Sequence, residues 1–288
     1  MKYNILITGG AGYVGAVLVP QLLKEGHSVS VVDLFMYGDD VLPNHERLKN
    51  YKMDIRDISA IDNIMAGHDI VIHLACISND PSFELNPVLG KSINLDAFEP
   101  MVKIAKECGV KRFIYASSSS VYGIKDEKNV VEDMSLDPLT DYSKFKADCE
   151  KILINYKSND FITTIVRPAT VCGYSKRQRL DLVVNILSNL AYHKREITVF
   201  GGNQLRPNIH ISDMVNFYDL LINAEDLKIN GEIFNAGFQN YSVNDLAETV
   251  KKIIGNDVKI IAKKSDDNRS YHISSAKILT HLNFKPNF

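Results

Sequence analysis

The sequence predicts an α/β protein with a doubly wound parallel sheet. Short apolar runs alternate with amphipathic stretches from the first residues, and the glycine-rich turn "GGAGYVG" separates the first run from the first stretch. The chain has 288 residues, of which 45% are hydrophobic, so a sizeable core can form. Alternation of strands and helices favours parallel strands joined by right-handed crossovers.

Each element follows from its local pattern. Apolar runs of strand length predict strands over Asn4–Thr8, Ser28–Asp33, Tyr51–Met53, Asp69–Leu74, Arg112–Ser117 and Thr163–Val166. Amphipathic stretches predict helices over Val14–Lys24, Val88–Cys108 and Tyr142–Tyr156. After Pro168 the elements shorten and the loops carry arginines. We therefore expect a main α/β domain over residues 1–167 and a smaller region over 168–288, some of whose elements return to the sheet.

Composition excludes several classes of protein. The net charge is −2 with both signs interspersed, unlike the basic surface of a nucleic-acid binder. No apolar run approaches the roughly 20 residues of a membrane span, and a strand begins at once without a signal peptide, so we expect a cytoplasmic protein. The four cysteines lie far apart and form no ligand pattern, so no metal site and no disulfide is expected.

The glycine-rich turn predicts a dinucleotide site. Gly9 permits the tight turn, Gly12 allows phosphates to approach the backbone, and Gly15 lets the helix lie close to the strand. The start of the helix supplies free N–H groups and the positive end of its dipole. Asp33 ends the second predicted strand, where a carboxylate accepts from both ribose hydroxyls of NAD and repels a 2′-phosphate. The expected cofactor is therefore NAD.

A second pattern indicates acid–base chemistry. Tyr142 and Lys146, in "DYSKFKAD", are four residues apart and share one face of a helix. A neighbouring ammonium favours the phenolate, so we expect Lys146 to lower the pKa of Tyr142 toward neutrality. The serines of "YASSSSVYG" follow a predicted strand, and ligands of such sheets bind beyond the carboxyl ends of the strands.

The order of these motifs resembles the extended short-chain dehydrogenase/reductase family, whose core is a Rossmann fold, and within it the nucleotide-sugar epimerases and dehydratases. The resemblance covers nearly the whole chain. It is carried by "TGGAGYVG", Asp33, "MDIRD", "HLA", Asn94, "SSSSVYG", "YSKFK" and "RPATVCG". The resemblance implies NAD binding by residues 1–167, substrate binding mainly by residues 168–288, and a structural role for Asn94 in bending a helix.

The resemblance also implies the site residues. Tyr142 is the expected acid/base, Lys146 the anchor of the nicotinamide ribose, and Ser118 the serine that holds the substrate oxygen. The implied cofactor contacts are Gly9, Gly12, Tyr13, Val14, Gly15, Asp33, Leu34, Asp54, Ile55, Leu74, Ala75, Tyr142, Lys146 and Pro168. The expected substrate contacts are Ser78, Ser118, Ser119, Arg179, Arg206 and Arg269, the last replacing a displaced phosphate-binding arginine of the family.

Family members share hydride transfer at a sugar carbinol, and their further chemistry needs different residues. The family's 4,6-dehydratases carry Asp-Glu where this chain has Ser119 and Ser120, which disfavours elimination of water. A 4-epimerase needs no further titratable group, and neither does a 4-ketoreductase or 4-dehydrogenase. "ISNDPSFELNP" and "RQRLDLVVN" depart from the common galactose epimerases and resemble surface-polysaccharide enzymes, some of which act on nucleotide-linked heptoses.

We therefore expect an NAD-dependent nucleotide-sugar 4-epimerase of surface-polysaccharide biosynthesis, with a transient 4-keto intermediate. A nucleotide-sugar 4-ketoreductase or 4-dehydrogenase remains open. So does a non-catalytic dinucleotide sensor, although such a protein would be expected to lose Tyr142 or Lys146. The expected partners are a nucleotide-diphosphate sugar and a second copy of the chain. The helices over Val88–Cys108 and Asp141–Tyr156 are expected to form the homodimer interface.

Overall fold

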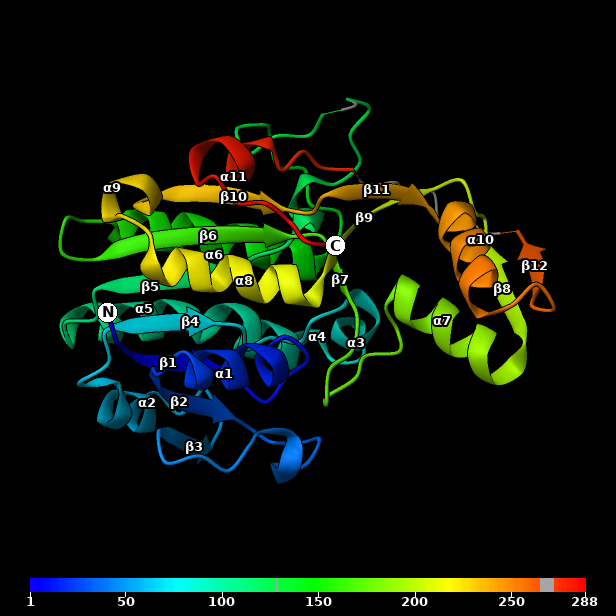
Figure 1. The fold of residues 1–288 in the computed structure, drawn as a ribbon. Coiled ribbons are helices and arrows are strands. Elements are labelled where there is room, and N and C mark those ends of the chain that lie inside the picture. Colours follow the sequence, from blue (N-terminus) through cyan, green and yellow to red (C-terminus); the bar gives the residue numbers. More distant parts are fainter. Residues whose placement is uncertain (128, 265–271) are drawn as a thin grey trace.

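The computed structural model describes residues 1–127, 129–264 and 272–288. Within them, seven parallel strands form one sheet in the order β10-β6-β5-β4-β1-β2-β3, which confirms the predicted doubly wound α/β fold (Figure 1). The strands are β1 Asn4–Thr8, β2 Ser28–Asp33, β3 Leu48–Lys52, β4 Ile70–His73, β5 Arg112–Ala116, β6 Ile162–Pro168 and β10 Glu232–Ala236. The edge strand β10 comes from the C-terminal part of the chain and pairs with β6.

Helices cover both faces of this sheet. Helices α1 (Gly15–Lys24) and α8 (Ile211–Asn223) contact each other on one face. Helices α2 (Ile58–Met65), α5 (Phe98–Glu107) and α6 (Asp141–Tyr156) contact one another in turn and lie behind the sheet in Figure 1. The short helices α9 (Asp226–Ile229) and α11 (Ala276–His281) pack beside β10.

The two faces bury separate apolar cores because side chains alternate along each strand. Ile5 and Ile7 of β1 belong to the core beneath α1 and α8, whereas Leu6 belongs to the core beneath α2, α5 and α6. All three side chains are fully buried. A sheet buried on both faces has strands that read as continuous apolar runs, which is the pattern the sequence shows.

The helix expected over Val88–Cys108 is wrong as a single element. The structure has α3 (Asp80–Glu84), α4 (Pro87–Lys91), a π-helical turn η2 (Ser92–Asp96) and then α5. Asn94, in the π turn, is buried and uses its side-chain amide to accept from the Ile77 N–H at 2.8 Å and to donate to the Ile77 carbonyl at 3.0 Å. The helix is therefore deformed where it holds the loop that follows β4.

The C-terminal part forms a smaller lobe at one end of the sheet (Figure 1). A three-stranded sheet joins β7 (Thr170–Cys172), β9 (Leu205–His210) and β11 (Gln239–Ser242), and β8 (Glu196–Phe200) pairs with β12 (Lys259–Lys263). Helices α7 (Val183–Lys194) and α10 (Val243–Ile254) pack on each other and share an apolar core with β8. In the part of the chain that the structure describes, no helix has both the length and the apolar character needed to cross a membrane.

Candidate active site

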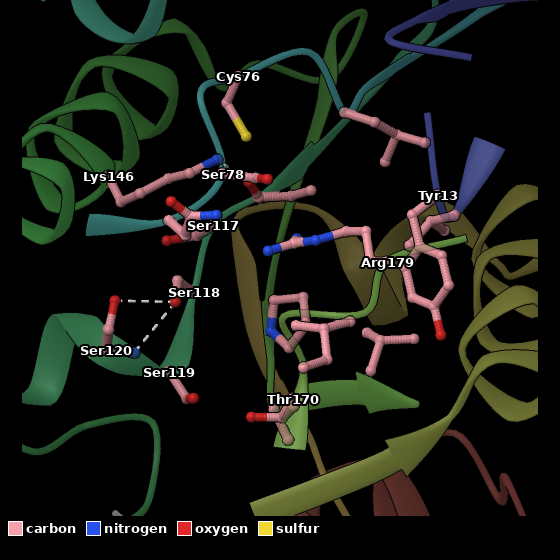
Figure 2. A pocket seen from close by; sticks show the side chains of 18 of the residues that line it. Tyr13, Cys76, Ser78, Ser117, Ser118, Ser119, Ser120, Lys146, Thr170 and Arg179 are labelled. Carbon is pink, nitrogen blue, oxygen red and sulfur yellow. Dashed lines mark hydrogen bonds between the residues drawn. The ribbon is translucent and has the colours of Figure 1, made fainter. Parts of the chain in front are cut away.

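A cavity of about 470 Å³ lies at the carboxyl ends of the central strands, between the main sheet and the smaller lobe (Figure 2). Its size is typical of small-molecule sites, and its position is where open parallel sheets bind ligands. Of the predicted site residues it brings together Gly9, Tyr13, Val14, Gly15, Leu74, Ala75, Ser78, Ser118, Ser119, Tyr142, Lys146, Pro168, Arg179 and Arg206.

Two glycines of the glycine-rich turn, Gly9 and Gly15, have no room for a side chain. Gly9 has φ +73°, and a Cβ there would lie 2.6 Å from the Ala75 nitrogen. A Cβ on Gly15 would lie 2.3 Å from the carbonyl oxygen of Gly10, within the turn itself. Among the described residues, no acceptor bonds the amides of Tyr13, Val14 and Gly15 at the start of α1. These free donors fit an anionic diphosphate.

Asp33 is fixed at the end of β2. Its carboxylate accepts from the Ala11 N–H of the glycine-rich turn and from the Phe35 N–H, each at 3.0 Å. A carboxylate has about four acceptor positions, so two remain for hydroxyl donors. Leu34, the next residue, is exposed. The carboxylate fits the predicted ribose contact.

Five of the predicted cofactor contacts do not line the cavity. Gly12, Asp33, Leu34, Asp54 and Ile55 are not among the residues that line the cavity. Ile55 is buried, and the Asp54 carboxylate accepts from the Arg56 side chain, an ion pair that holds the pKa of Asp54 below its ordinary value. These five positions remain predictions.

The residues at the end of β5 contact α6 directly. The Lys146 ammonium donates to the Ala116 carbonyl at 2.6 Å and lies 5.9 Å from the centre of the Tyr142 ring. Thr140 caps the N-terminus of α6 by accepting from the Ser143 N–H, and its hydroxyl donates to Asp80 at 2.7 Å. The cap therefore ties the start of the helix that carries Tyr142 to the start of α3.

Ser118 stands between β5 and the 3₁₀ turn η3 (Ser119–Tyr122). Its hydroxyl pairs with that of Ser120 at 2.8 Å and accepts from the Ser120 N–H at 3.1 Å (Figure 2). Ser118 also lies close enough to Tyr142 to lower the pKa of its phenol. The three residues predicted to be catalytic, Ser118, Tyr142 and Lys146, thus meet at one wall of the cavity.

The predicted direction of the Tyr142 pKa is wrong. Burial raises the pKa above its ordinary value, while Lys146, Ser118 and Arg179 each oppose this, so the net direction is upward. Burial also disfavours the charged form of Lys146, but Cys76 and Tyr142 counter it, and the pKa of Lys146 is raised. Lys146 therefore stays charged, and it reduces a burial penalty on the phenolate without removing it.

An arginine crosses the opposite wall. Arg179 pairs with Asp181 through two of its nitrogens, with Nε 3.1 Å and Nη2 2.5 Å from the carboxylate oxygens. Asn79 donates to the same carboxylate at 3.2 Å. Figure 2 shows the Arg179 side chain reaching across the cavity toward Ser78 and Lys146, which agrees with its effect on the Tyr142 pKa. Arg206 lines the cavity from β9, and Arg269 lies outside the described residues.

Several residues that line the cavity were not among the predicted site residues. Cys76 lines the cavity beside Lys146, although its place directly after "HLA" could have signalled this. Asp181 stands two residues after Arg179, and Asn79 and Asp80 start α3. Their side chains reach the site through loops of irregular backbone, which periodicity does not predict.

The comparisons with known proteins agree with this geometry. The NAD dependent epimerase/dehydratase family matches residues 5–237. UDP-glucose 4-epimerase of Lactobacillus helveticus is 27% identical over 98% of this chain and 92% of that protein. UDP-N-acetyl-alpha-D-glucosaminuronate decarboxylase of Bacillus cytotoxicus is 30% identical over 91% of this chain and 83% of that protein.

Solved structures show the same fold. UDP-glucose 4-epimerase of Thermotoga maritima with UDP-glucose has a TM-score of 0.87 and 26% identity, covering 99% of this chain and 94% of that chain. MoeE5 in complex with UDP-glucuronic acid and NAD has a TM-score of 0.87 and 25% identity over the same shares. The stated resemblance and the expectation of NAD as the cofactor are both confirmed, because this chain belongs to the NAD dependent epimerase/dehydratase family.

Proposed function

We propose that this chain is an NAD-dependent nucleotide-sugar 4-epimerase that acts through a transient 4-keto sugar, in the cytoplasm, in surface-polysaccharide biosynthesis. One observation carries the proposal: Ser118, Tyr142 and Lys146 meet beside the glycine-rich turn, and Ser118 is followed by hydroxyls at Ser119 and Ser120. The cavity carboxylates of Asp80 and Asp181 already accept from Thr140 and Arg179. This disfavours elimination, which needs a free acid and base.

The residues present fit NAD. Free amides at Tyr13 and Val14 suit the pyrophosphate, and the Asp33 carboxylate suits the adenosine ribose. Lys146 and Pro168 line the cavity where the nicotinamide end is expected. Bound NAD supplies the hydride acceptor, and the protein positions the sugar carbon that gives up the hydride.

The proton is handled by the chain's own residues. Tyr142 Oη, as phenolate, takes the proton of the sugar C4 hydroxyl, and Ser118 donates a hydrogen bond to the same oxygen. Lys146 stabilises the phenolate by its charge. After the ketosugar turns its other face, C4 takes the hydride back on that face and Tyr142 returns the proton to the C4 oxygen. No net oxidation or proton release results, so the product has the mass of the substrate.

The substrate's diphosphate and sugar are assigned to arginines of the C-terminal part. Arg206 on β9 and Arg179 in the loop before α7 line the cavity, and Arg269 is proposed for the diphosphate from the sequence alone. The similar proteins named above carry UDP-linked sugars in their names, so UDP-glucose, UDP-N-acetyl-alpha-D-glucosaminuronate and UDP-glucuronic acid are the first substrates to test.

The purified protein is first assayed for NAD(H) released by denaturation, and then incubated with each nucleotide sugar. Epimerisation gives a product of equal mass with inverted C4 by sugar NMR, without added cofactor. A change of two hydrogens that needs added NAD(H) supports the reductase or dehydrogenase instead. Loss of carbon dioxide from a uronic acid supports a decarboxylase. The Tyr142→Phe variant should be inactive in every case.

We further propose a homodimer built on α5 and α6. The neighbouring α4 contacts α6, and apolar side chains near it are largely exposed, with Leu85 at 86% and Val88 at 81%. A partner that covers them would remove apolar surface from water. Light scattering at micromolar concentration should give twice the chain mass, and a monomer would refute the proposal.

A further inference from the structure

A buried ion pair lies directly behind the wall that carries Ser118. The Arg167 guanidinium donates to both carboxylate oxygens of Glu150, from Nε at 3.0 Å and from Nη2 at 2.7 Å. Their side chains are only 3% and 4% exposed. A buried ion pair is costly to form unless its remaining hydrogen-bond positions are also satisfied. The residues that fill those positions are therefore held in place by the pair.

Those partners are the two ends of the serine segment. At its start, the Ser117 hydroxyl donates to the Glu150 carboxylate. At its end, the Tyr122 hydroxyl, on the last residue of η3, accepts from Arg167 Nη1 at 2.7 Å and donates to Asn235 at 2.7 Å. One ion pair therefore fixes both ends of residues 117–122, which carry Ser118, Ser119 and Ser120.

The same pair also fixes this segment relative to α6. Tyr142, Lys146 and Glu150 follow at intervals of four residues and share one face of the helix. Three successive residues meet them: Ala116 accepts from Lys146, Ser117 donates to Glu150, and Ser118 lies near enough to Tyr142 to lower the pKa of its phenol. Contact between the catalytic serine and the catalytic tyrosine thus depends on the register of these two elements.

The backbone shows how Ser117 can direct Ser118. Ser118 has φ −160° and ψ 147°, which is extended chain, and successive side chains of extended chain point to opposite sides. Ser117 turns toward Glu150, whereas Figure 2 shows the Ser118 hydroxyl turned toward Ser120. A rotation that freed Ser117 from Glu150 would therefore also turn the neighbouring Ser118.

From this arrangement we propose that Glu150 and Arg167 are positioning residues of the reaction centre, acting through Ser117 on the Ser118–Tyr142 contact. This rests on the proposed function of Tyr142 as acid/base. The pair does not touch the cavity itself, since only Ser117 among these three residues lines it. Its role is to hold the Ser118 hydroxyl near the phenol and the substrate oxygen, and small displacements of such groups lower rates strongly.

Ser117→Ala is the sharpest test because it removes one hydroxyl and leaves the ion pair in place. We expect kcat to fall by about 10–100-fold, while KM and the bound NAD(H) per chain stay within about twofold of the wild-type values. Arg167→Lys keeps the charge but loses the two-pronged contact, and should lower both kcat and the thermal midpoint.

Arg112→Lys is the matched control. Arg112 is also buried and bonds Asp226 and the carbonyls of Ile222 and Ala224, but it stands at the first residue of β5, at the other end of the sheet. The Arg112→Lys variant should have a lower thermal midpoint and an unchanged kcat. If Arg112→Lys lowers kcat as much as Arg167→Lys, general destabilisation explains the effect and the proposal is wrong.

A readout that does not depend on turnover separates this proposal from the proposed function. The ultraviolet difference between each protein and its Tyr142→Phe counterpart reports ionisation of the Tyr142 phenol alone. In Ser117→Ala the phenol should titrate at a higher pH than in the wild type, because Ser118, which lowers the pKa of Tyr142, is displaced. An unshifted titration together with a wild-type kcat would overturn the proposal. A wild-type protein that converts no nucleotide sugar would instead refute the proposed function.

Discussion

The ammonium of Lys146 lies 5.9 Å from the centre of the Tyr142 ring, one helical turn away, and is held there by the Ala116 carbonyl. The lysine is therefore placed by the end of β5 and not only by its own helix. Its side chain is buried, so its charge acts on the phenol with little screening by water. This arrangement makes the pair suitable for proton transfer and suggests how each residue can be tested.

Tyr142→Phe should abolish turnover while leaving the fold and NAD binding intact, because it removes only the hydroxyl. General acid–base groups contribute about 10²–10⁴-fold to rate, so kcat should fall by at least that range. Lys146→Met should lower both kcat and the affinity for NAD, since its ammonium is assigned to both. Steady-state kinetics and cofactor titration measure these effects. A Tyr142→Phe enzyme that keeps most of its activity would remove the central assignment.

The pH dependence of kcat tests the electrostatics of the pair. The base must be deprotonated, so kcat should rise with pH through the apparent pKa of Tyr142. Burial raises this pKa and Lys146 is the largest opposing influence, so Lys146→Met should move the profile further to high pH. Residual activity of the variant, followed across the alkaline range, measures the shift. A profile that stays in place or moves to lower pH would contradict the assignment.

The regular part of the fold could be predicted because it depends on local pattern. The runs over Asn4–Thr8 and Ser28–Asp33 are strands with the predicted bounds, since burial on both faces makes them continuously apolar. Some elements of residues 168–288 were expected to return to the sheet, but the edge strand β10, Glu232–Ala236, was not predicted. Its pairing with β6 joins segments about 70 residues apart, and no local pattern indicates which strand will add to a sheet edge.

The candidate site was predictable where one motif carries several of its residues, as with Tyr142 and Lys146. Contacts between motifs were not. Asp181 forms an ion pair with Arg179, and Glu150 accepts a hydrogen bond from Ser117. No sequence pattern around either carboxylate predicts which residue it contacts. The sign of the Tyr142 pKa shift was also missed, because the cost of burial depends on the surrounding fold while the helical spacing of Lys146 does not.

Asp33 should select NAD over NADP. Its carboxylate is fixed by the Ala11 and Phe35 amides and would repel a 2′-phosphate. The fold also brings Arg177 to the loop after β2, where its guanidinium stacks 3.8 Å from the centre of the Tyr37 ring. A positive charge therefore also lies near this loop. Asp33→Asn should weaken NAD binding by about tenfold or more and reduce the preference for NAD over NADP. Comparable wild-type affinities for both cofactors would contradict the prediction.

Arg179 should contribute to substrate affinity. Asp181 occupies two of its nitrogens, and Nη1 has no acceptor among the described residues. Hydrogen bonds to charged groups contribute about 1.5–3 kcal/mol, so Arg179→Met should raise KM by about 10–100-fold. Lys176→Ala, an exposed change in the same loop, is the control and should leave KM unchanged. Equal KM values for the wild type and Arg179→Met would place the arginine outside the substrate site.

Three titratable side chains at the C-terminal end of α1 should make the thermal stability of the protein depend on pH. Glu25, His27 and Asp219 gather with one side-chain oxygen or nitrogen from each within 4.8 Å of the others. Burial and, next, the neighbouring Asp219 carboxylate raise the pKa of Glu25 to about 7 from its ordinary 4.5. Glu25 is therefore a carboxyl group that the folded protein prefers to keep protonated.

The sign of the effect follows from that direction. A carboxyl whose folded pKa exceeds its unfolded pKa binds its proton more tightly when folded, so its stabilisation is fully present below about pH 4.5 and is lost as pH rises through about 7. Asp219→Asn removes the like charge, so it should raise the thermal midpoint at about pH 8 and change it little at about pH 5. Calorimetry at both pH values, in low salt, measures the difference. Glu248→Gln, on the exposed face of α10, should give the same small change at each pH. If Asp219→Asn shifts the midpoint equally at both pH values, Asp219 does not raise the pKa of Glu25 and the predicted pH dependence is wrong.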